Sequence, residues 1–366
     1  MKSQNAARPW VMAALLCAPV TPLLAAEAAL PKLEEPTPLN KNRFGVSYRA
    51  GYNITAQFKN VGNVKNPATG RDPGPATGGG VDRFYDDGYN RVDISGNKDG
   101  LTWFWGHKNL PGQVVPGNDT VVMHSTTASP ITSKPVGSDP EHGFEVTYNR
   151  ELGRSEKSGR SWGLEFGVGW TDLEINDHRR LTGGRRTISD AFGREGVNPN
   201  VEPTSAQFPG HAGNYEGPNA LIEDNPTRSI SYSRNGSQVT GARQFDADLF
   251  SFRLGPYLDL PIDTNWTFSI SAGLALGVID GQFHFDQRVT TGVTTRQIGT
   301  GGNTDVLLGG FASASLRYAI NDRWSLFASG QYLGLADRYS ATARGQRIEL
   351  DLTRTVFLAL GVSYSF

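Results

Sequence analysis

Histidines are the first residues of this 366-residue chain to test for catalysis, because imidazole is the side chain that most readily transfers protons near neutral pH. The six histidines are scattered, and the sequence contains neither an H-E-x-x-H nor a G-x-S-x-G motif. The nearest approach to an acid–base pair is His178 beside Asp177. No run of acidic residues has the spacing of a calcium loop. We therefore expect no catalytic residue, no enzyme activity, no metal site and no cofactor.

Charged residues that alternate with apolar ones form a second set. If the apolar residues face outward, the opposite, inward face carries a mixture of cations and anions. The clearest members are Arg49, Glu145, Glu165, Arg253 and Arg317. Mixed charges on an enclosed face must be paired or hydrated. Two interpretations stay open, a polar pore and a salt-bridge network that fills a narrow lumen; the inward parity of Phe311, Phe327 and Phe357 slightly favours the narrow lumen.

The densest basic cluster of the chain consists of Arg179, Arg180, Arg185 and Arg186. Pairs of guanidinium groups suit the phosphates of a glycolipid or other anions. The cluster is therefore a candidate contact for lipopolysaccharide. The alternative is that these are solvated charges of a polar loop.

A period of two in hydrophobicity identifies the elements that position these residues. From Phe44 to Phe58 every even position is apolar or alanine, and every odd position is polar or glycine. The same alternation recurs in residues 162–170, 266–278, 306–320, 324–336 and 348–366. Side chains of a strand point alternately to its two faces, so these segments are predicted to be β-strands.

The second face of these strands separates the possible all-β classes. In a soluble sandwich or lipocalin-like barrel, the solvent-exposed face of each strand is rich in Lys, Glu and Thr. Here that face is mostly Gly, Ser and Ala with isolated charges, and glycine makes up 44 of the 366 residues. The segments also reach the roughly 9 to 11 residues that a tilted strand needs to cross a bilayer, and closure would remove the sheet edges. The pattern favours an antiparallel transmembrane β-barrel.

Aromatic residues open or close several of the predicted strands. Phe44, Trp162, Trp266 and Trp324 each begin an outward-facing series, and Phe366 ends the last one. If the adjacent short connections lie on one side, the five rings share one depth, as expected for a girdle at the lipid–water boundary. Aromatic residues that only filled a sandwich core would not need to stand at strand ends.

The first residues have the features of an export signal. Lys2 and Arg8 precede an apolar segment, residues 10–24, that ends in small residues. We expect residues 1–26 to be a signal peptide, with cleavage after Ala28 as an alternative, residues 27–41 to be a Pro-rich periplasmic leader, and residues 42–366 to form the barrel. The single cysteine, Cys17, leaves with the signal peptide, so no disulfide is expected.

The last strand ends in Val362, Tyr364 and Phe366, with apolar residues at alternate positions before them. Together with the signal peptide and the repeated strands, this ending resembles Gram-negative outer-membrane β-barrel proteins, whose assembly machinery recognises such a C-terminal strand. The resemblance implies location in the cell outer membrane, with outer-membrane lipid, lipopolysaccharide and the barrel assembly machinery as partners. It does not identify one characterised member or an oligomeric state.

Eleven strands can be counted, and single-chain bacterial barrels have an even number, so we expect twelve strands, with 10 to 14 as the range. Long polar segments, residues 60–80, 177–243, 286–304 and 337–346, are expected outside the cell. Asn235-Gly236 predicts a hairpin within residues 229–240. Pro256 and a change in apolar parity between Leu249 and Phe250 predict a bulge in the following strand.

The formal net charge of −1 and an isoelectric point near 6.6 argue against a nucleic-acid binder. Two function classes remain. The first is a narrow, porin-like channel for passive diffusion of small polar solutes. The alternative is a structural or surface-interaction barrel with a plugged lumen, which acts through its long extracellular loops.

Overall fold

A computed structural model describes residues 41–92, 100–102, 104–108, 110–115, 120–194 and 222–366. Every regular element in these ranges is a strand, and none of them contains a helix long and apolar enough to span a membrane. The predicted signal peptide and all but the last residue of the predicted leader lie outside the described residues.

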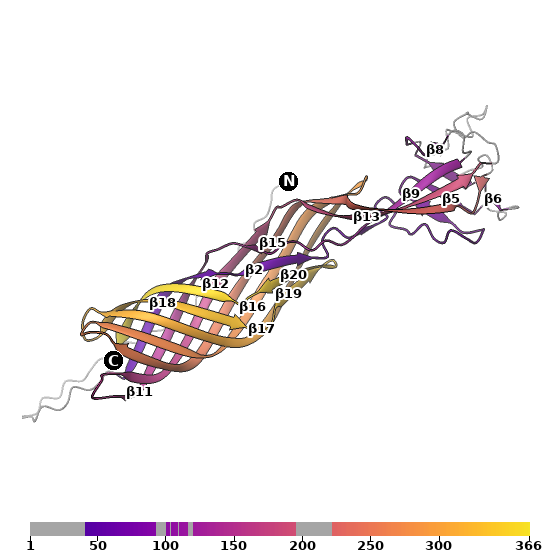
Figure 1. Cartoon of the computed structure of the whole chain (residues 1–366). Helices are drawn as coiled ribbons and strands as arrows, with labels where there is room; N and C mark the ends of the chain where they lie inside the picture. Colours follow the sequence, from indigo (N-terminus) through magenta and orange to yellow (C-terminus); the bar gives the residue numbers. More distant parts are fainter. Residues whose placement is uncertain (1–40, 93–99, 103, 109, 116–119, 195–221) are drawn as a thin grey trace, which may run out of the picture. The chain divides into compact units, whose positions relative to one another are not determined.

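Eight strands close into a ring in which every neighbour is antiparallel (Figure 1). They follow the order β12, β11, β1, β21, β18, β17, β16 and β15, and the pairing of β15 with β12 completes the circle. A closed ring leaves no strand edge unpaired. The members are β1 (Asn42–Tyr52), β11 (Glu141–Arg154), β12 (Ser161–Asp177), β15 (Thr227–Pro261), β16 (Trp266–Thr290), β17 (Thr294–Ala319), β18 (Trp324–Leu335) and β21 (Thr355–Ser365).

The expected twelve-stranded barrel is therefore corrected to a ring of eight. Twelve strands share the hydrogen-bonded sheet, but β3 (Val64–Lys65), β8 (Val114–Val115), β9 (Thr120–Ala128) and β13 (Leu181–Gly193) extend from one side of it. β4 (Arg83–Tyr85), β5 (Gly88–Arg91) and β7 (Phe104–His107) form a separate small sheet. Local alternation cannot distinguish a ring strand from a strand that pairs elsewhere, so counting from sequence included the wrong ones.

One end of the ring carries the expected aromatic residues on its outside. Trp324 and Trp266 are the first residues of β18 and β16. Their rings contact Tyr364 and Tyr318 on neighbouring strands, at centroid distances of 5.0 and 4.9 Å. Phe44 is in register with Tyr364. Trp162 and Phe366 are each 53% exposed.

A second row of aromatic residues crosses four neighbouring strands further along the ring. Tyr48, Phe144, Trp170 and Phe250 are consecutive partners in register, and the rings of Phe144 and Trp170 stack at 6.1 Å. Trp162 and Trp170 mark the two rows on β12. Eight residues of strand span about 26 Å, or about 20 Å after a tilt of about 40°. Between the rows the outward side chains are apolar, large ones such as Leu164 and Phe166 on β12 and small ones such as Ala312 and Ala314 on β17, and they define an apolar belt.

Beyond the belt the ring continues as two facing sheets. β10 (Val136–Gly137), β2 (Thr55–Lys59), β20 (Gln346–Asp351) and β19 (Tyr339–Ala343) form one sheet in that order. β12, β15, β16 and β17 run on past the belt. The chain passes from β1 to β2 through Asn53, whose φ of +62° redirects it. Phe58 packs on Phe283 at 5.6 Å, and Phe245 packs on Tyr339 at the same distance. The two sheets thus share an apolar core.

Two expectations about the segment before Pro261 are wrong. Asn235-Gly236 lies inside β15, which pairs with β13 and with β12, so the hairpin is absent from this described segment. The predicted bulge is also absent, because β12 and β15 stay in register from Ser161 to Asp177. The change in parity has another cause. Phe245, Ala247 and Leu249 point into the ring, whereas Phe250, Phe252 and Leu254 point outward.

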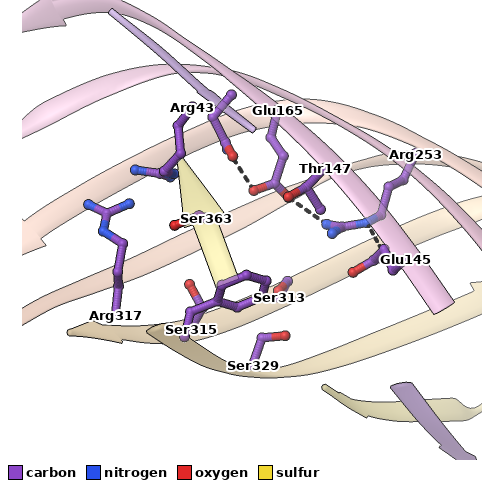
Figure 2. Close-up of a pocket in the computed structure, with 12 residues that line it drawn as sticks. Arg43, Glu145, Thr147, Glu165, Arg253, Ser313, Ser315, Arg317, Ser329 and Ser363 are labelled. Atoms are coloured by element: carbon purple, nitrogen blue, oxygen red, sulfur yellow. Dashed lines mark hydrogen bonds and ion pairs between the residues drawn. The ribbon is translucent and has the colours of Figure 1, made fainter. Parts of the chain in front are cut away.

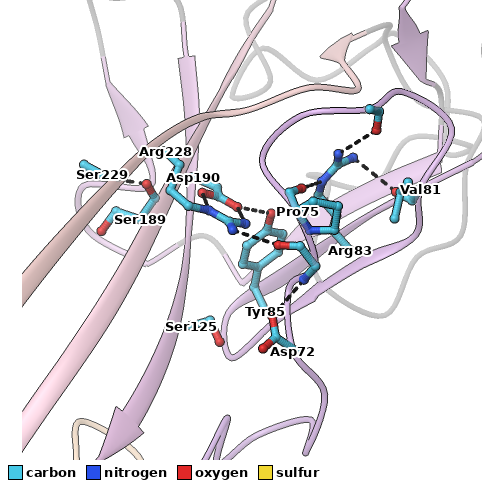
Figure 3. A network of polar contacts seen from close by, with 12 residues as sticks. Asp72, Pro75, Val81, Arg83, Tyr85, Ser125, Ser189, Asp190, Arg228 and Ser229 are labelled. Atoms are coloured by element: carbon cyan, nitrogen blue, oxygen red, sulfur yellow. Dashed lines mark hydrogen bonds and ion pairs between the residues drawn. The ribbon is translucent and has the colours of Figure 1, made fainter.

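A polar network ties β13 and β15 to the strands around β4 (Figure 3). Asp190 is completely buried and accepts two hydrogen bonds from the Arg228 guanidinium, at 2.7 and 2.6 Å, and a third from the Tyr85 hydroxyl at 2.6 Å. Burial, and then the hydrogen bond to Asp190, raise the pKa of Tyr85 well above its ordinary value. Arg83 donates to four backbone carbonyls, including those of Pro75 and Val81. The bidentate pair between Arg228 and Asp190 fixes the geometry of β15 and β13, the strands that carry the two residues.

Asp190→Asn is expected to destabilise this network by about 2 kcal/mol, because it leaves the half-buried Arg228 guanidinium, 17% exposed, without its counter-ion. Amide hydrogen exchange should speed up in β9 and β13 while the ring strands keep their protection. Asp286→Asn is the control, because its pair with Arg296 is exposed, at 43% and 58%, and such pairs contribute little. Equal exchange in both variants would contradict the assignment.

Candidate functional site

The five predicted lumen charges come from five different ring strands. Arg49, Glu145, Glu165, Arg253 and Arg317 lie on β1, β11, β12, β15 and β17. All occupy odd positions, opposite in parity to the exposed apolar residues of the belt on the same stretch of strand. The ring closure therefore brings together residues that are far apart in sequence.

Arg253 lies between two carboxylates in this lumen (Figure 2). Its Nε donates to Glu145 Oε1 at 3.0 Å, and its Nη1 donates to Glu165 Oε1. Glu165 also accepts from Asn149 at 2.8 Å and from Ser271 at 3.0 Å. The Arg253 side chain is only 5% exposed. The pairing neutralises charges that would otherwise be costly in an enclosed space.

Arg49 is completely buried on the same level of the ring. Its guanidinium donates to Thr171 Oγ1 at 2.7 Å and to Ser251 Oγ at 2.9 Å, lies 3.8 Å from Glu145, and covers the Phe357 ring at 4.2 Å. Gly169 makes room for it, because a Cβ at that position would lie 2.2 Å from Arg49 Nη1. The guanidinium is fixed by neighbours on every side.

Asp259 completes the site and was missed by the sequence analysis. Its Oδ2 accepts from Arg43 at 2.8 Å and from Arg317 at 3.0 Å. The sequence contains a signal for it, because Asp259 and Arg253 occupy odd positions of the same strand, β15, and so point to the same face. Four guanidinium groups now face three carboxylates, a formal charge of +1 for these seven residues.

A polar cavity of about 40 Å³ lies among these groups (Figure 2). Arg43, Glu145, Glu165, Arg253 and Arg317 all line it, together with several serines. Since one water needs roughly 10–15 Å³ of such volume, the cavity has room for about two to four waters. It is too small for an organic solute.

Apolar side chains fill the ring on the other side of Arg49. Leu249 and Ile279 continue the register row that contains Thr171, and Leu173 lies two residues further along β12. These three and Leu335 and Phe357 are at most 1% exposed. An eight-stranded barrel has an interior just wide enough for side chains to fill. The lumen therefore has a charged layer and, beyond it, a layer of buried apolar side chains.

The predicted assembly residues lie on the outer surface of β21 or directly after it. Val362 and Phe366 are 43% and 53% exposed. Tyr364 stacks on Phe366 at 6.1 Å and accepts a hydrogen bond from Arg323. The C-terminal residues are thus part of the aromatic row at this end of the ring.

The four arginines of the predicted glycolipid site do not share one face. Arg185 and Arg186 are adjacent in β13 and point to opposite sides of it. Arg179 is held by Asp177 at 2.8 Å, and Arg180 is exposed beside it. The prediction treated the whole segment as a loop, in which neighbouring side chains can converge. Arg179 and Arg180 do lie in the connection between β12 and β13, but Arg185 and Arg186 lie within β13.

The nearest acid–base candidate of the sequence, His178 beside Asp177, does not form a pair in the structure. The Asp177 carboxylate forms ion pairs with Arg179, at 2.8 Å, and with Arg243, at 3.2 Å. His178 is exposed. Within the described ranges no group of three or more His, Cys, Asp or Glu side chains is arranged to hold a metal ion.

Comparison with known proteins finds no matching family model and no matching curated protein. Among solved structures, the chain is similar to several outer-membrane barrels. The outer membrane protease OmpT of Escherichia coli has a TM-score of 0.35 at 7% identity, with 90% of this chain and 98% of that chain covered. The outer membrane protein OprG of Pseudomonas aeruginosa has a TM-score of 0.31 at 8% identity, with 90% of this chain and 99% of that chain covered. Ail, the attachment invasion locus protein of Yersinia pestis, has a TM-score of 0.27 at 9% identity, with 89% of this chain and 99% of that chain covered.

Arg253→Met is expected to lower the free energy of unfolding by about 3 kcal/mol, because Glu165 then loses its counter-ion and Glu145 keeps only the longer pair with Arg49, at 3.8 Å. The triple variant with Glu145→Gln and Glu165→Gln should recover most of the loss. Urea unfolding of the detergent-solubilised protein, followed by tryptophan fluorescence, measures both. If the single variant matches the unmodified protein, the carboxylates do not depend on Arg253.

Proposed function

We propose that the chain is an integral outer-membrane barrel with a sealed lumen, and that it acts at the cell surface through the strands beyond the belt. The observation that carries the proposal is the filling of the eight-stranded ring by paired charges and by a layer of buried apolar side chains. A lumen of this kind holds the strands together but offers no path for a solute.

Three features support the location and the orientation. The belt between the two aromatic rows is about 20 Å tall, near the roughly 25 Å apolar band of outer-membrane barrels. The connections at the Trp266 and Trp324 end are short, with residues 262–265 and 320–323 between successive strands. The opposite end carries β2, β19, β20 and the extensions of β15, β16 and β17. Outer-membrane barrels have short turns on the periplasmic side and longer segments outside.

The partners follow from the same arrangement and belong to the proposal. Outer-leaflet lipid, including lipopolysaccharide, would surround the belt near Tyr48, Phe144 and Trp170. The barrel assembly machinery would recognise β21 with its terminal Phe366. Membrane insertion, rather than catalysis, is the role that these surfaces suit.

A narrow channel is the second candidate. It is favoured by the polar cavity beside Arg253 and by the formal charge of +1, which would suit a small anion. Conduction requires the layer around Leu249 and Phe357 to open.

Reconstitution in a planar bilayer separates the two candidates. We expect the unmodified protein to give no conductance steps under conditions in which a general porin gives them. Arg49→Ser with Phe357→Ala removes the two largest side chains at the boundary of the layers and should create steps. Steady, ohmic conductance of the unmodified protein, reduced by Arg253→Glu if anions carry it, would overturn the sealed lumen.

A further inference from the structure

A second cavity, of about 240 Å³, lies beyond the belt, beside the tip of the β19–β20 hairpin and strands β16 and β17. Its lining is rich in amides and guanidinium groups and contains no carboxylate. The residues used below are Asn60, Asn63, Arg296, Gln297, Arg344 and Gln346. Phe285 and Ile298 add an apolar edge.

The hairpin tip that borders the cavity is a two-residue turn. Ala343 pairs with Gln346, and the residues between them, Arg344 and Gly345, have φ values of +45° and +81°. Positive φ at both central positions is the geometry of the turn that matches the twist of a hairpin. The backbone therefore holds Arg344 at a fixed place on the rim.

An amide network forms one wall and leaves acceptors unused. Gln297 Oε1 accepts from Gln287 at 3.0 Å and from Gln346 at 3.2 Å, and Gln297 donates to the Asn63 carbonyl at 3.0 Å. Gln346 is 4% exposed, and its Oε1 has no partner among the described residues; the same holds for Gln287 Oε1. A buried polar atom without a partner is uncommon and calls for a donor. A hydroxyl group supplies one.

The cavity also carries unbalanced positive charge. Arg296 forms two hydrogen bonds with Asp286, at 2.9 and 2.6 Å. Arg344 makes no ion pair within the described part of the chain. A guanidinium group binds a planar carboxylate through two parallel hydrogen bonds. An anionic group on the ligand would therefore be placed at the hairpin tip.

We propose that this cavity binds one monosaccharide unit that carries a carboxylate. Ring hydroxyls donate to Gln346 Oε1 and accept from the amide groups, the carboxylate pairs with Arg344, and the C–H face of the ring lies against Phe285 and Ile298. The volume is below the roughly 300 Å³ at which pockets for drug-sized ligands begin, so a single sugar ring is the appropriate size. The inference rests on the proposed function only in placing this end of the protein outside the cell.

Isothermal titration of the purified full-length barrel in detergent tests the proposal, with glucuronate as the probe and glucose as its neutral counterpart. We expect saturable binding of glucuronate and at least about tenfold weaker binding of glucose, since one charged pair is worth on the order of a factor of ten. Arg344→Asn should lower the affinity for glucuronate to the affinity for glucose. Asparagine before Gly345 keeps a turn that favours positive φ.

Arg234→Asn is the matched control, because Arg234 is exposed on β15 and does not line the cavity. It should leave both affinities unchanged. Gln346→Met keeps the size of the side chain and removes the Oε1 acceptor. It should weaken the binding of both sugars about tenfold. Circular dichroism and heat-modified mobility in gels establish that each variant is folded.

Absence of saturable glucuronate binding to the unmodified protein, or unchanged binding in a folded Arg344→Asn variant, would overturn the proposal. Neither result bears on conductance. A protein that conducts and also binds glucuronate would overturn the sealed lumen and leave the sugar site standing.

Discussion

The pairing of β12 with β15 is the constraint on which the rest of the structure depends. Seventeen residue pairs in unbroken register, from Ser161 with Asp259 to Asp177 with Arg243, join the two ends of what would otherwise be an open sheet. Closure turns one face of every strand toward a shared interior and the other toward the surroundings. It also fixes the ring at eight strands, and that number limits the interior to the volume of its own side chains.

Charge burial and lumen closure follow from this limit. Arg49 and Arg253 are at most 5% exposed, so each is paired with carboxylates or hydroxyls from neighbouring strands. Beyond them the interior becomes apolar and continues into the core shared by the two facing sheets. The ring and its extension are therefore one continuous packed structure.

The sequence predicted the ring strands and their faces well, because alternation reports directly on which side chains share a face. It placed Arg49, Glu145, Glu165, Arg253 and Arg317 on one side, where the structure has them. It could not give the strand number, because β4, β5 and β9 show local strand patterns but pair outside the ring. It also misread β15, where the apolar residues change face at Leu249 because the apolar environment changes from the lumen to the outer belt. Asp259 was overlooked although its parity was available.

Contact between the outer belt and hydrocarbon is the central claim, and spin labels measure it most directly. With the single cysteine, Cys17, removed, labels are placed at Leu360→Cys, on the belt and 68% exposed, and at Tyr232→Cys, beyond the belt and 76% exposed. In lipid vesicles the Leu360 label should collide with dissolved oxygen and be shielded from an aqueous nickel chelate, and the Tyr232 label should show the reverse. Free collision of the nickel chelate with the label at position 360 would contradict a membrane-embedded barrel.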